Sequence, residues 1–321
     1  MKIDQGHVAN GTGWELAVRR TLEATAPTQP RPVLIVPGYG MNSFIFGFHP
    51  HGRSLEAHLA YRGFEVWSAD LRAQGRSRWV SSQPRPVQHG LEDLALTDLP
   101  AVLGDVLQRT QTGSKTVDVI GCSLGATLMF AQAAIQRDPR MGALVSFGGP
   151  LRWERVHPAL RVAFASPWLA GVVPFRGTRT LAATALPLLA RVPWLLSPYL
   201  NAGVTDLSRA SEMVQTVEDP IPAINREIAV WIHAMDLTLR GVNVTKALGA
   251  LTNPLLCVVA SADGIVPRET VLSAREAIGS SVRDVLTVGD EQTAIAHADL
   301  FLCHDAVERV FDPLANWLAA R

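Results

Sequence analysis

The sequence predicts an α/β fold: a doubly wound, mostly parallel sheet with an inserted helical cap. Two observations indicate the sheet. Short apolar runs alternate with segments of helical periodicity, which is typical of βαβ units. A Gly-x-Ser-x-Gly pentapeptide stands between one such run and the helix that follows it. A third observation indicates the cap, because residues 151–252 interrupt the alternation before it resumes.

The alternation defines the expected elements. The run 33–36 is apolar throughout, as expected of a strand buried on both faces. Further strands are expected at 14–23, 64–69, 116–120, 141–147, 254–260 and 282–288. Helices are expected at 54–62, 91–108, 124–136, 268–278 and 304–320. The α/β core would then comprise residues 1–150 and 253–321.

The interruption at 151–252 is much longer than an ordinary αβ crossover. It is rich in Pro, Trp, Leu and Ala and has helical periodicity, as at 224–239. We expect a helical cap that covers the carboxyl edge of the sheet and lines a pocket with apolar side chains. Trp168 and Trp194 are candidates for that lining; the alternative is that these side chains pack only against one another.

Composition excludes several classes. Of 321 residues, 48% are hydrophobic and 18% charged, which excludes a disordered chain. Lys and Arg number 29, as do Asp and Glu, so no basic excess favours nucleic acid. Three widely spaced cysteines exclude a disulfide scaffold. Without an apolar leader or an uninterrupted apolar run, we expect a cytoplasmic protein with no membrane span. The oligomeric state stays open.

The strongest chemical signal is Gly121-Cys122-Ser123-Leu124-Gly125. It follows an expected strand and opens an expected helix, which is the context of a nucleophile elbow. Such a turn strains the serine backbone and raises its hydroxyl above the sheet. The glycines leave room for neighbouring backbone. Ser123 is therefore the predicted nucleophile.

An acid and a base are expected after the cap, in that order. Asp263 ends an expected strand at the edge where ligands bind in open α/β sheets. His297 lies in the loop before the last expected helix, and Asp299 beside it is read as a local loop or helix-start residue. The rival candidates are Asp284, Asp290, Glu291 and His304.

An oxyanion hole needs two N–H donors. One should come from Leu124, the residue after the nucleophile. The other should come from the glycine-rich loop after the strand 33–36. Tyr39 is the expected donor there, with Gly40 or Met41 as alternatives.

These features together resemble the α/β-hydrolase fold superfamily, from about residue 33 to the end of the chain. The resemblance is carried by the loop 37–40 (PGYG), the loop 70–77 (DLRAQGRS), the pentapeptide 121–125, the turn 263–267 and His297. It implies a hydrolase with the triad and oxyanion hole just described.

Two groups within the superfamily are similar in detail. Residues 54–55 and 63–67 resemble acid lipases. The loop around Pro37 and the run 121–127 resemble polyhydroxyalkanoate synthases, which use Cys where this chain has Ser123. Many relatives also carry His-Gly where this chain has Pro37 and Gly38.

We therefore expect a serine esterase or lipase that cleaves a small, lipophilic carboxylic ester through an acyl-enzyme. One alternative is an acyltransferase or thioesterase acting on CoA- or carrier-bound acyl groups. Another is a binding protein on a degenerate hydrolase fold. We expect no cofactor and no metal; His49 and His51 lack acidic or Cys partners in the sequence and are read as loop residues.

Overall fold

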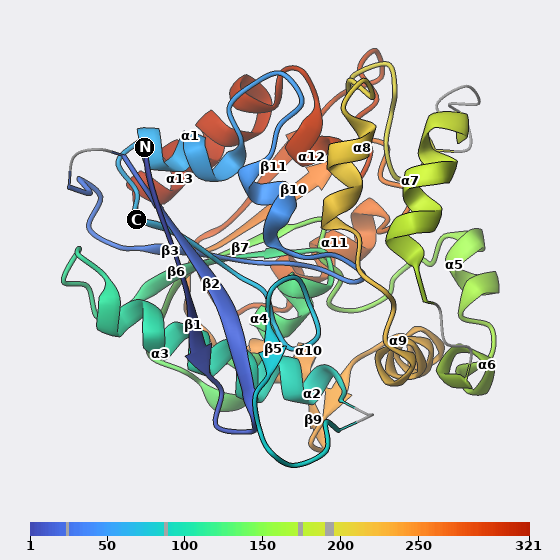
Figure 1. Ribbon diagram of the computed structural model, residues 1–321, viewed down its shortest axis with the longest axis horizontal. Coiled ribbons are helices and arrows are strands. Elements are labelled where there is room, and N and C mark those ends of the chain that lie inside the picture. Colours follow the sequence, from blue (N-terminus) through green and yellow to red (C-terminus); the bar gives the residue numbers. More distant parts are fainter. Residues whose placement is uncertain (24–25, 87–88, 173–175, 190–195) are drawn as a thin grey trace.

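The computed structural model describes residues 1–23, 26–86, 89–172, 176–189 and 196–321. In this part of the chain a nine-stranded sheet has the order β1-β2-β4-β3-β6-β7-β10-β11, and β5 pairs with β2 (Figure 1). Neighbouring strands from β4 to β11 are parallel, whereas β1 and β2 extend the sheet antiparallel at one edge. The predicted mostly parallel α/β fold is confirmed.

The strands of the sheet are β1 (Lys2–Ala9), β2 (Trp14–Leu22), β3 (Val33–Val36), β4 (Val66–Ala69), β5 (Arg78–Trp79), β6 (Val117–Cys122), β7 (Met141–Phe147), β10 (Leu255–Ala260) and β11 (Arg283–Val288). The helices of the core are η1 (Ser43–Gly47), α1 (Leu55–Tyr61), α2 (Leu91–Asp93), η2 (Leu94–Asp98), α3 (Leu99–Arg109), α4 (Leu124–Gln136), α11 (Arg268–Ala277), α12 (Asp299–Leu302), η5 (Val307–Phe311) and α13 (Asp312–Ala319).

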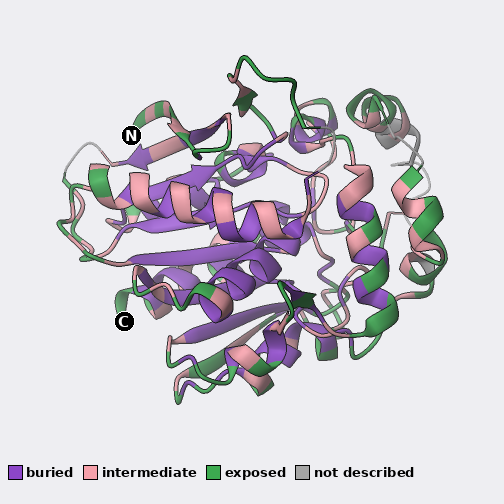
Figure 2. Cartoon of the chain, turned by 90° about the horizontal axis from the view of Figure 1, so that it is seen from below, coloured by how far each residue is buried: buried purple, intermediate pink, exposed green. Residues whose placement is uncertain are grey.

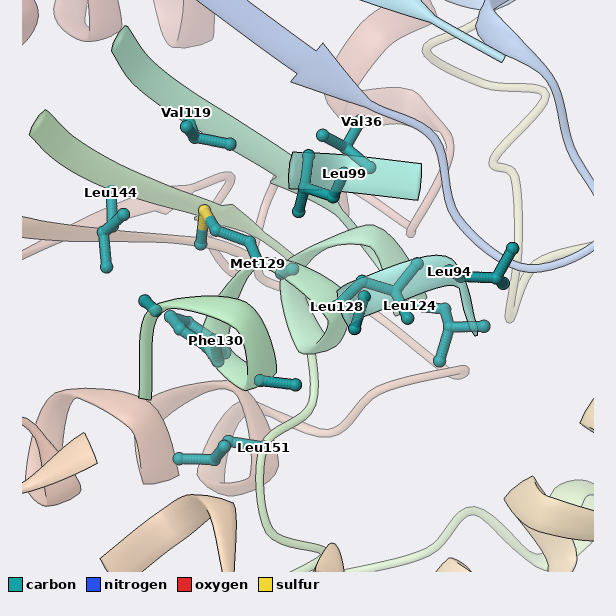
Figure 3. Packing of buried hydrophobic residues seen from close by; sticks show 14 of the residues in the cluster. Val36, Leu94, Leu99, Val119, Leu124, Leu128, Met129, Phe130, Leu144 and Leu151 are labelled. Carbon is teal, nitrogen blue, oxygen red and sulfur yellow. The ribbon is translucent and has the colours of Figure 1, made fainter. Parts of the chain in front are cut away.

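Helices cover both faces of the sheet. In β3, Leu34 and Val36 join the core under α3, α4 and α11, whereas Val33 and Ile35 join the core under α1, α12 and α13. Alternate side chains of one strand therefore serve two cores, which explains the unbroken apolar run. Around α4, Met129 and Phe130 lie in the first of these cores (Figure 3).

The expected elements agree with the structure outside the chain ends and the insertion, although η1 and β5 were not expected. β1 was missed, because as an edge strand it buries little and has no apolar stripe. The expected helix 304–320 runs continuously from 306 to 319, with a π-helical stretch at η5, and is preceded by the short helix α12. The expected helical run 224–239 ends at Ala234, since Met235 has a left-handed backbone (φ 61°) and a hairpin follows.

The insertion contains α5 (Pro158–Ala163), α6 (Pro167–Val172), α7 (Thr178–Leu189), α8 (Ala210–Met213), η4 (Val214–Thr216), α9 (Pro222–Ala234), β8 (Thr238–Leu239), β9 (Val242–Asn243) and α10 (Val244–Leu248). Its two halves differ in burial (Figure 2). In α10, Val244 and Leu248 are fully buried in the core that α4 shares. In α6, Trp168 is 68% exposed, so the expectation that it lines a pocket is wrong. Trp194 lies outside the described residues.

None of the helices in the described ranges is both long and apolar enough to cross a membrane.

Candidate active site

Ser123 occupies the turn between β6 and α4. Its backbone has φ 52° and ψ −122°, a region that side-chain-bearing residues rarely adopt. Packing holds this strain in place: a Cβ on Gly121 would lie 2.3 Å from Cα of Ala126, and one on Gly125 would lie 2.4 Å from the Val36 carbonyl oxygen. Both glycines are thus required by close backbone approach, as the pentapeptide predicts.

Asp263 and His297 meet after β10 and β11. The His297 Nδ1 lies 2.6 Å from Asp263 Oδ2, and the two side chains are 11% and 1% exposed, respectively. The other carboxylate oxygen accepts the N–H groups of Ile265 and Val266, at 2.8 Å each. The turn therefore fixes the carboxylate, and the carboxylate fixes the imidazole with its Nε2 turned away from the acid.

The charge of Asp263 sets the protonation of His297. Burial lowers the pKa of His297, but the negative charge of Asp263 and its hydrogen bond raise it more. The net pKa is above the ordinary value of 6.5. An imidazole of this kind is a stronger base than a free histidine, which suits proton abstraction from a hydroxyl.

Gly148 and Gly149, which follow β7, lie between the serine turn and the histidine. A Cβ on Gly148 would lie 2.9 Å from Cε1 of His297, and one on Gly149 would lie 3.1 Å from the Ser123 carbonyl oxygen. Ser123, Asp263 and His297 are thus gathered at one edge of the sheet. Within the described ranges, the Ser123 hydroxyl has no hydrogen-bond partner. The hydrogen bond between a catalytic hydroxyl and its base often tightens only when substrate binds.

The loop after β3 passes directly beside Ser123. A Cβ on Gly38 would lie 2.9 Å from the Ser123 Cβ and 2.7 Å from the Cys122 carbonyl oxygen. Leu124 is the first residue of α4, so its N–H has no partner within the helix. Neither this N–H nor that of Tyr39 bonds to a backbone carbonyl in the described part of the chain. Both donors expected for an oxyanion hole are therefore available.

Hydrogen bonds from the insertion hold the loop after β3. The Gly40 carbonyl accepts the N–H of Glu218 at 2.8 Å, and the N–H of Asn42 donates to Thr216 at 2.9 Å. The Tyr39 hydroxyl donates to the Asn225 side-chain oxygen at 2.5 Å, and Asn225, on α9, is only 4% exposed. Burial raises the pKa of Tyr39 to about 12, so the phenol keeps its proton. Sequence reasoning missed Asn225, since nothing in the insertion's sequence marks which helix turn meets the loop.

The histidine loop is held in the same way. Asp299 accepts the N–H of Ala296 at 2.8 Å, the N–H of Asn201 at 3.0 Å and the hydroxyl of Thr205 at 2.7 Å. It begins α12, as expected of a helix-start residue, but its contacts with Asn201 and Thr205 join the loop to the insertion and were not expected. The Tyr199 ring lies 6.2 Å from the His297 ring, centre to centre. Tyr199 is a second site neighbour that the sequence did not indicate.

The rival candidates lie elsewhere. Asp284 accepts from Trp317 on the surface, and Asp290 accepts the N–H groups of its own turn. His304 is exposed and stacks on His51. His49 is buried, with its ring facing the Cys303 carbonyl. Among the residues that the structure describes, no group of His, Cys, Asp or Glu could hold a metal ion.

A small cavity of about 20 Å³ lies beside the loop and the start of α4. Its apolar lining includes Leu94, Leu124, Leu128, Ile221 and Ile224. The residues 218–221 also border an open cleft of about 1290 Å³ that extends along α9. The small cavity therefore lies beside the expected oxyanion loop and shares residues 218–221 with a much larger cleft.

The chain matches the alpha/beta hydrolase family over residues 33–310. No curated protein sequence matches it. Among solved structures, the esterase RhEst1 from Rhodococcus sp. ECU1013 is 17% identical with a TM-score of 0.62, covering 100% of this chain and 99% of that one. The 2-hydroxy-6-oxo-6-phenylhexa-2,4-dienoate hydrolase from Rhodococcus sp. strain RHA1 is 16% identical with a TM-score of 0.61, covering 99% and 98%. The thioesterase domain from the curacin biosynthetic pathway is 16% identical with a TM-score of 0.60, covering 100% of both chains.

The sheet order and the serine turn define a protein of α/β-hydrolase architecture. The family match covers most of the chain, so this chain belongs to the alpha/beta hydrolase family. The identities to solved structures are low and support the fold alone.

Proposed function

We propose that the protein is a serine hydrolase that cleaves carboxylic esters with a lipophilic acyl group. The observation that carries the proposal is the 2.6 Å contact between Asp263 and His297 at the sheet edge where the strained Ser123 turn lies. An acid, an imidazole and a strained serine at one edge are the three groups that activate a serine hydroxyl as a nucleophile. A binding protein on this fold has no need of that arrangement.

In the proposed mechanism, His297 removes the proton of the Ser123 hydroxyl as its oxygen attacks the acyl carbon. Asp263 holds the imidazole and stabilises its cation. The N–H groups of Leu124 and Tyr39 stabilise the oxyanion; losing one such donor costs about 10²–10³ in rate. His297 then protonates the leaving alcohol, and water deacylates Ser123 by the same route.

The first carbons of the acyl group are assigned to the apolar cavity beside Leu124, whose volume of about 20 Å³ holds roughly one methylene, and a longer chain leaves it past residues 218–221. Leu128 and Ile224 supply aliphatic walls, and a buried methylene there gains about 0.8 kcal/mol. In this proposal residues 151–252 act as the cap: their segment 216–225 contacts the oxyanion loop and contributes to the cavity wall.

The test combines covalent labelling with a substrate series. A fluorophosphonate probe should label wild-type protein and leave Ser123→Ala unlabelled. p-Nitrophenyl esters should show a rate that rises from acetate to a medium chain. Absence of both labelling and hydrolysis would contradict the proposal. Transfer of the acyl group to added CoA in preference to water would instead identify an acyltransferase.

A further inference from the structure

Helix α7, which stands beside α8, begins on a short segment of the insertion that also contacts the loop after β3 (Figure 1). Arg179, in the first turn of α7, donates to the Val217 carbonyl at 3.0 Å and to the Glu218 carboxylate at 2.8 Å. The carboxylate of the next residue, Asp219, accepts two N–H groups at the start of the helix, at 2.7 and 3.1 Å. None of residues 178–185 is buried, so these polar contacts hold the beginning of α7.

The Glu218 carboxylate also reaches the loop after β3. The oxygen that accepts from Arg179 accepts the Asn42 side-chain amide at 2.5 Å and the N–H of Gly75 at 3.0 Å as well. The Glu218 side chain is only 18% exposed. Within the described ranges, Arg179 itself has no hydrogen bond to the loop after β3. One carboxylate therefore joins three segments that are far apart in the sequence: this loop, the loop 70–77 and α7.

The loop after β3 depends on such contacts for its shape. Its glycines make it easy to deform, and Gly40 has a left-handed backbone (φ 62°). Glu218 holds the loop twice, through its own N–H to the Gly40 carbonyl at 2.8 Å and through its side chain to Asn42. The N–H of Tyr39 must point at the developing oxyanion to stabilise it, and a misplacement of about 1 Å costs roughly 100-fold in rate.

We propose that Glu218 is a positioning residue that makes the geometry of the oxyanion donor depend on helix α7. With α7 in place, the positive charge of Arg179 keeps the partly buried carboxylate where Asn42 and Gly75 donate to it. When α7 shifts, the carboxylate loses its cation and holds the loop less firmly. Glu218 and Asp219 also line the open cleft, so a ligand in the cleft contacts this junction. The effect on rate rests on the proposed ester hydrolysis, whereas the coupling of helix and loop does not.

The first test compares kcat and KM for a soluble p-nitrophenyl ester. Glu218→Ala should lower kcat roughly 30-fold or more with KM nearly unchanged, because hydrogen bonds to a charged acceptor are lost and the donor acts in the transition state. Glu218→Gln keeps an oxygen that accepts from Asn42 and Gly75, so it should lose only about fivefold. Arg179→Met should lose about fivefold too, since it removes the charge on α7 and leaves the loop untouched.

A second ion pair of the insertion supplies matched controls. Arg209 and Glu212 are paired at 2.5 Å, and neither is bonded to the loop after β3 within the described ranges. Glu212→Ala and Arg209→Met should keep kcat within about twofold. The double variant Glu218→Ala, Arg179→Met should be no slower than Glu218→Ala alone, because Arg179 acts through this carboxylate. Circular dichroism and the melting temperature check that every variant is folded.

Hydrogen–deuterium exchange tests the coupling without catalysis. The N–H groups of residues 38–42 should exchange faster in Arg179→Met than in wild type or in Arg209→Met. The same difference should appear on a Ser123→Ala background. A protein that hydrolyses no ester but shows this difference would contradict the proposed function and support the coupling. The proposal is overturned if the loop exchanges alike in Arg179→Met and Arg209→Met, or if Glu218→Ala hydrolyses esters at the wild-type rate.

Discussion

The turns at the sheet edge are tightly packed, whereas part of the insertion beside them is largely exposed. At the turns, a Cβ on Gly38, Gly121 or Gly125 would lie within 3 Å of other atoms, so the geometry of Ser123 is fixed by backbone packing. In the insertion, α6 has no buried residue at all. A site that performs chemistry needs the first kind of structure, whereas a surface that selects partners or substrates tolerates the second. Substitutions in the two regions should therefore fail in different ways.

The largest effect is expected at the nucleophile. Ser123→Ala should reduce ester hydrolysis by about 10⁵–10⁶-fold, because the remaining groups have no oxygen to activate. The melting temperature should change little, since the hydroxyl has no hydrogen-bond partner in the described part of the chain. The measurement is kcat/KM on a soluble ester.

Ser146→Ala is the matched control for this substitution. Ser146 lies on β7, close to Gly149, and its buried hydroxyl likewise has no hydrogen-bond partner among the residues that the structure describes. It should keep near wild-type activity. A Ser123→Ala variant as active as Ser146→Ala would show that the nucleophile is another residue.

The next effect concerns the acid. Asp263→Asn should lower kcat by about 10⁴-fold, because the amide holds His297 in the wrong tautomer. The pH profile sharpens this test. Wild-type activity should rise as pH passes upward through the His297 pKa, which Asp263 holds above 6.5. Without the carboxylate, burial alone acts on the imidazole and lowers that pKa, so the acid limb should move to lower pH. An unmoved limb would assign the titration to another group.

How far the sequence predicts each region follows from what carries the signal. β3, α4 and β7 are predicted with their bounds, because apolar runs and glycine turns are local signals. Ser123, Asp263 and His297 were placed by the order of elements, and the structure brings the three to one edge. Tyr199 and Asn225 were not predicted, since their roles depend on how a long insertion folds back. The same long-range packing decides that Trp168 points to solvent.

A smaller effect is expected where the insertion meets the loop. Tyr39→Phe and Asn225→Leu each remove the 2.5 Å hydrogen bond that holds the loop. Each should lower kcat about tenfold with KM nearly unchanged. The reason is that each variant loses roughly one hydrogen bond that positions the oxyanion donor. The double variant should lose little more than either single one, because both act through one contact.

Asn243→Ala is the control for this pair. Asn243 caps α10 within the same insertion but away from the loop, so the variant should lose about 1 kcal/mol of stability and keep its kcat. If the fall in kcat of the double variant Tyr39→Phe, Asn225→Leu is the sum of the two single effects in free energy, the positioning role is contradicted.

The smallest effect concerns acyl-chain length. Ile224 is 4% exposed and lines the cavity beside Leu124, whereas Val230 lies on the same helix and is 51% exposed. Ile224→Ala should lengthen the cavity and move the preferred p-nitrophenyl ester to a longer chain, with roughly a fourfold gain for each added methylene that finds room. Val230→Ala, which removes similar atoms from the outer side of α9, should leave the preference unchanged. The two variants share a helix and a final residue, so helix propensity cannot explain a difference between them. If both shift the profile equally, or neither does, the acyl group lies elsewhere, and the open cleft along α9 becomes the place to search.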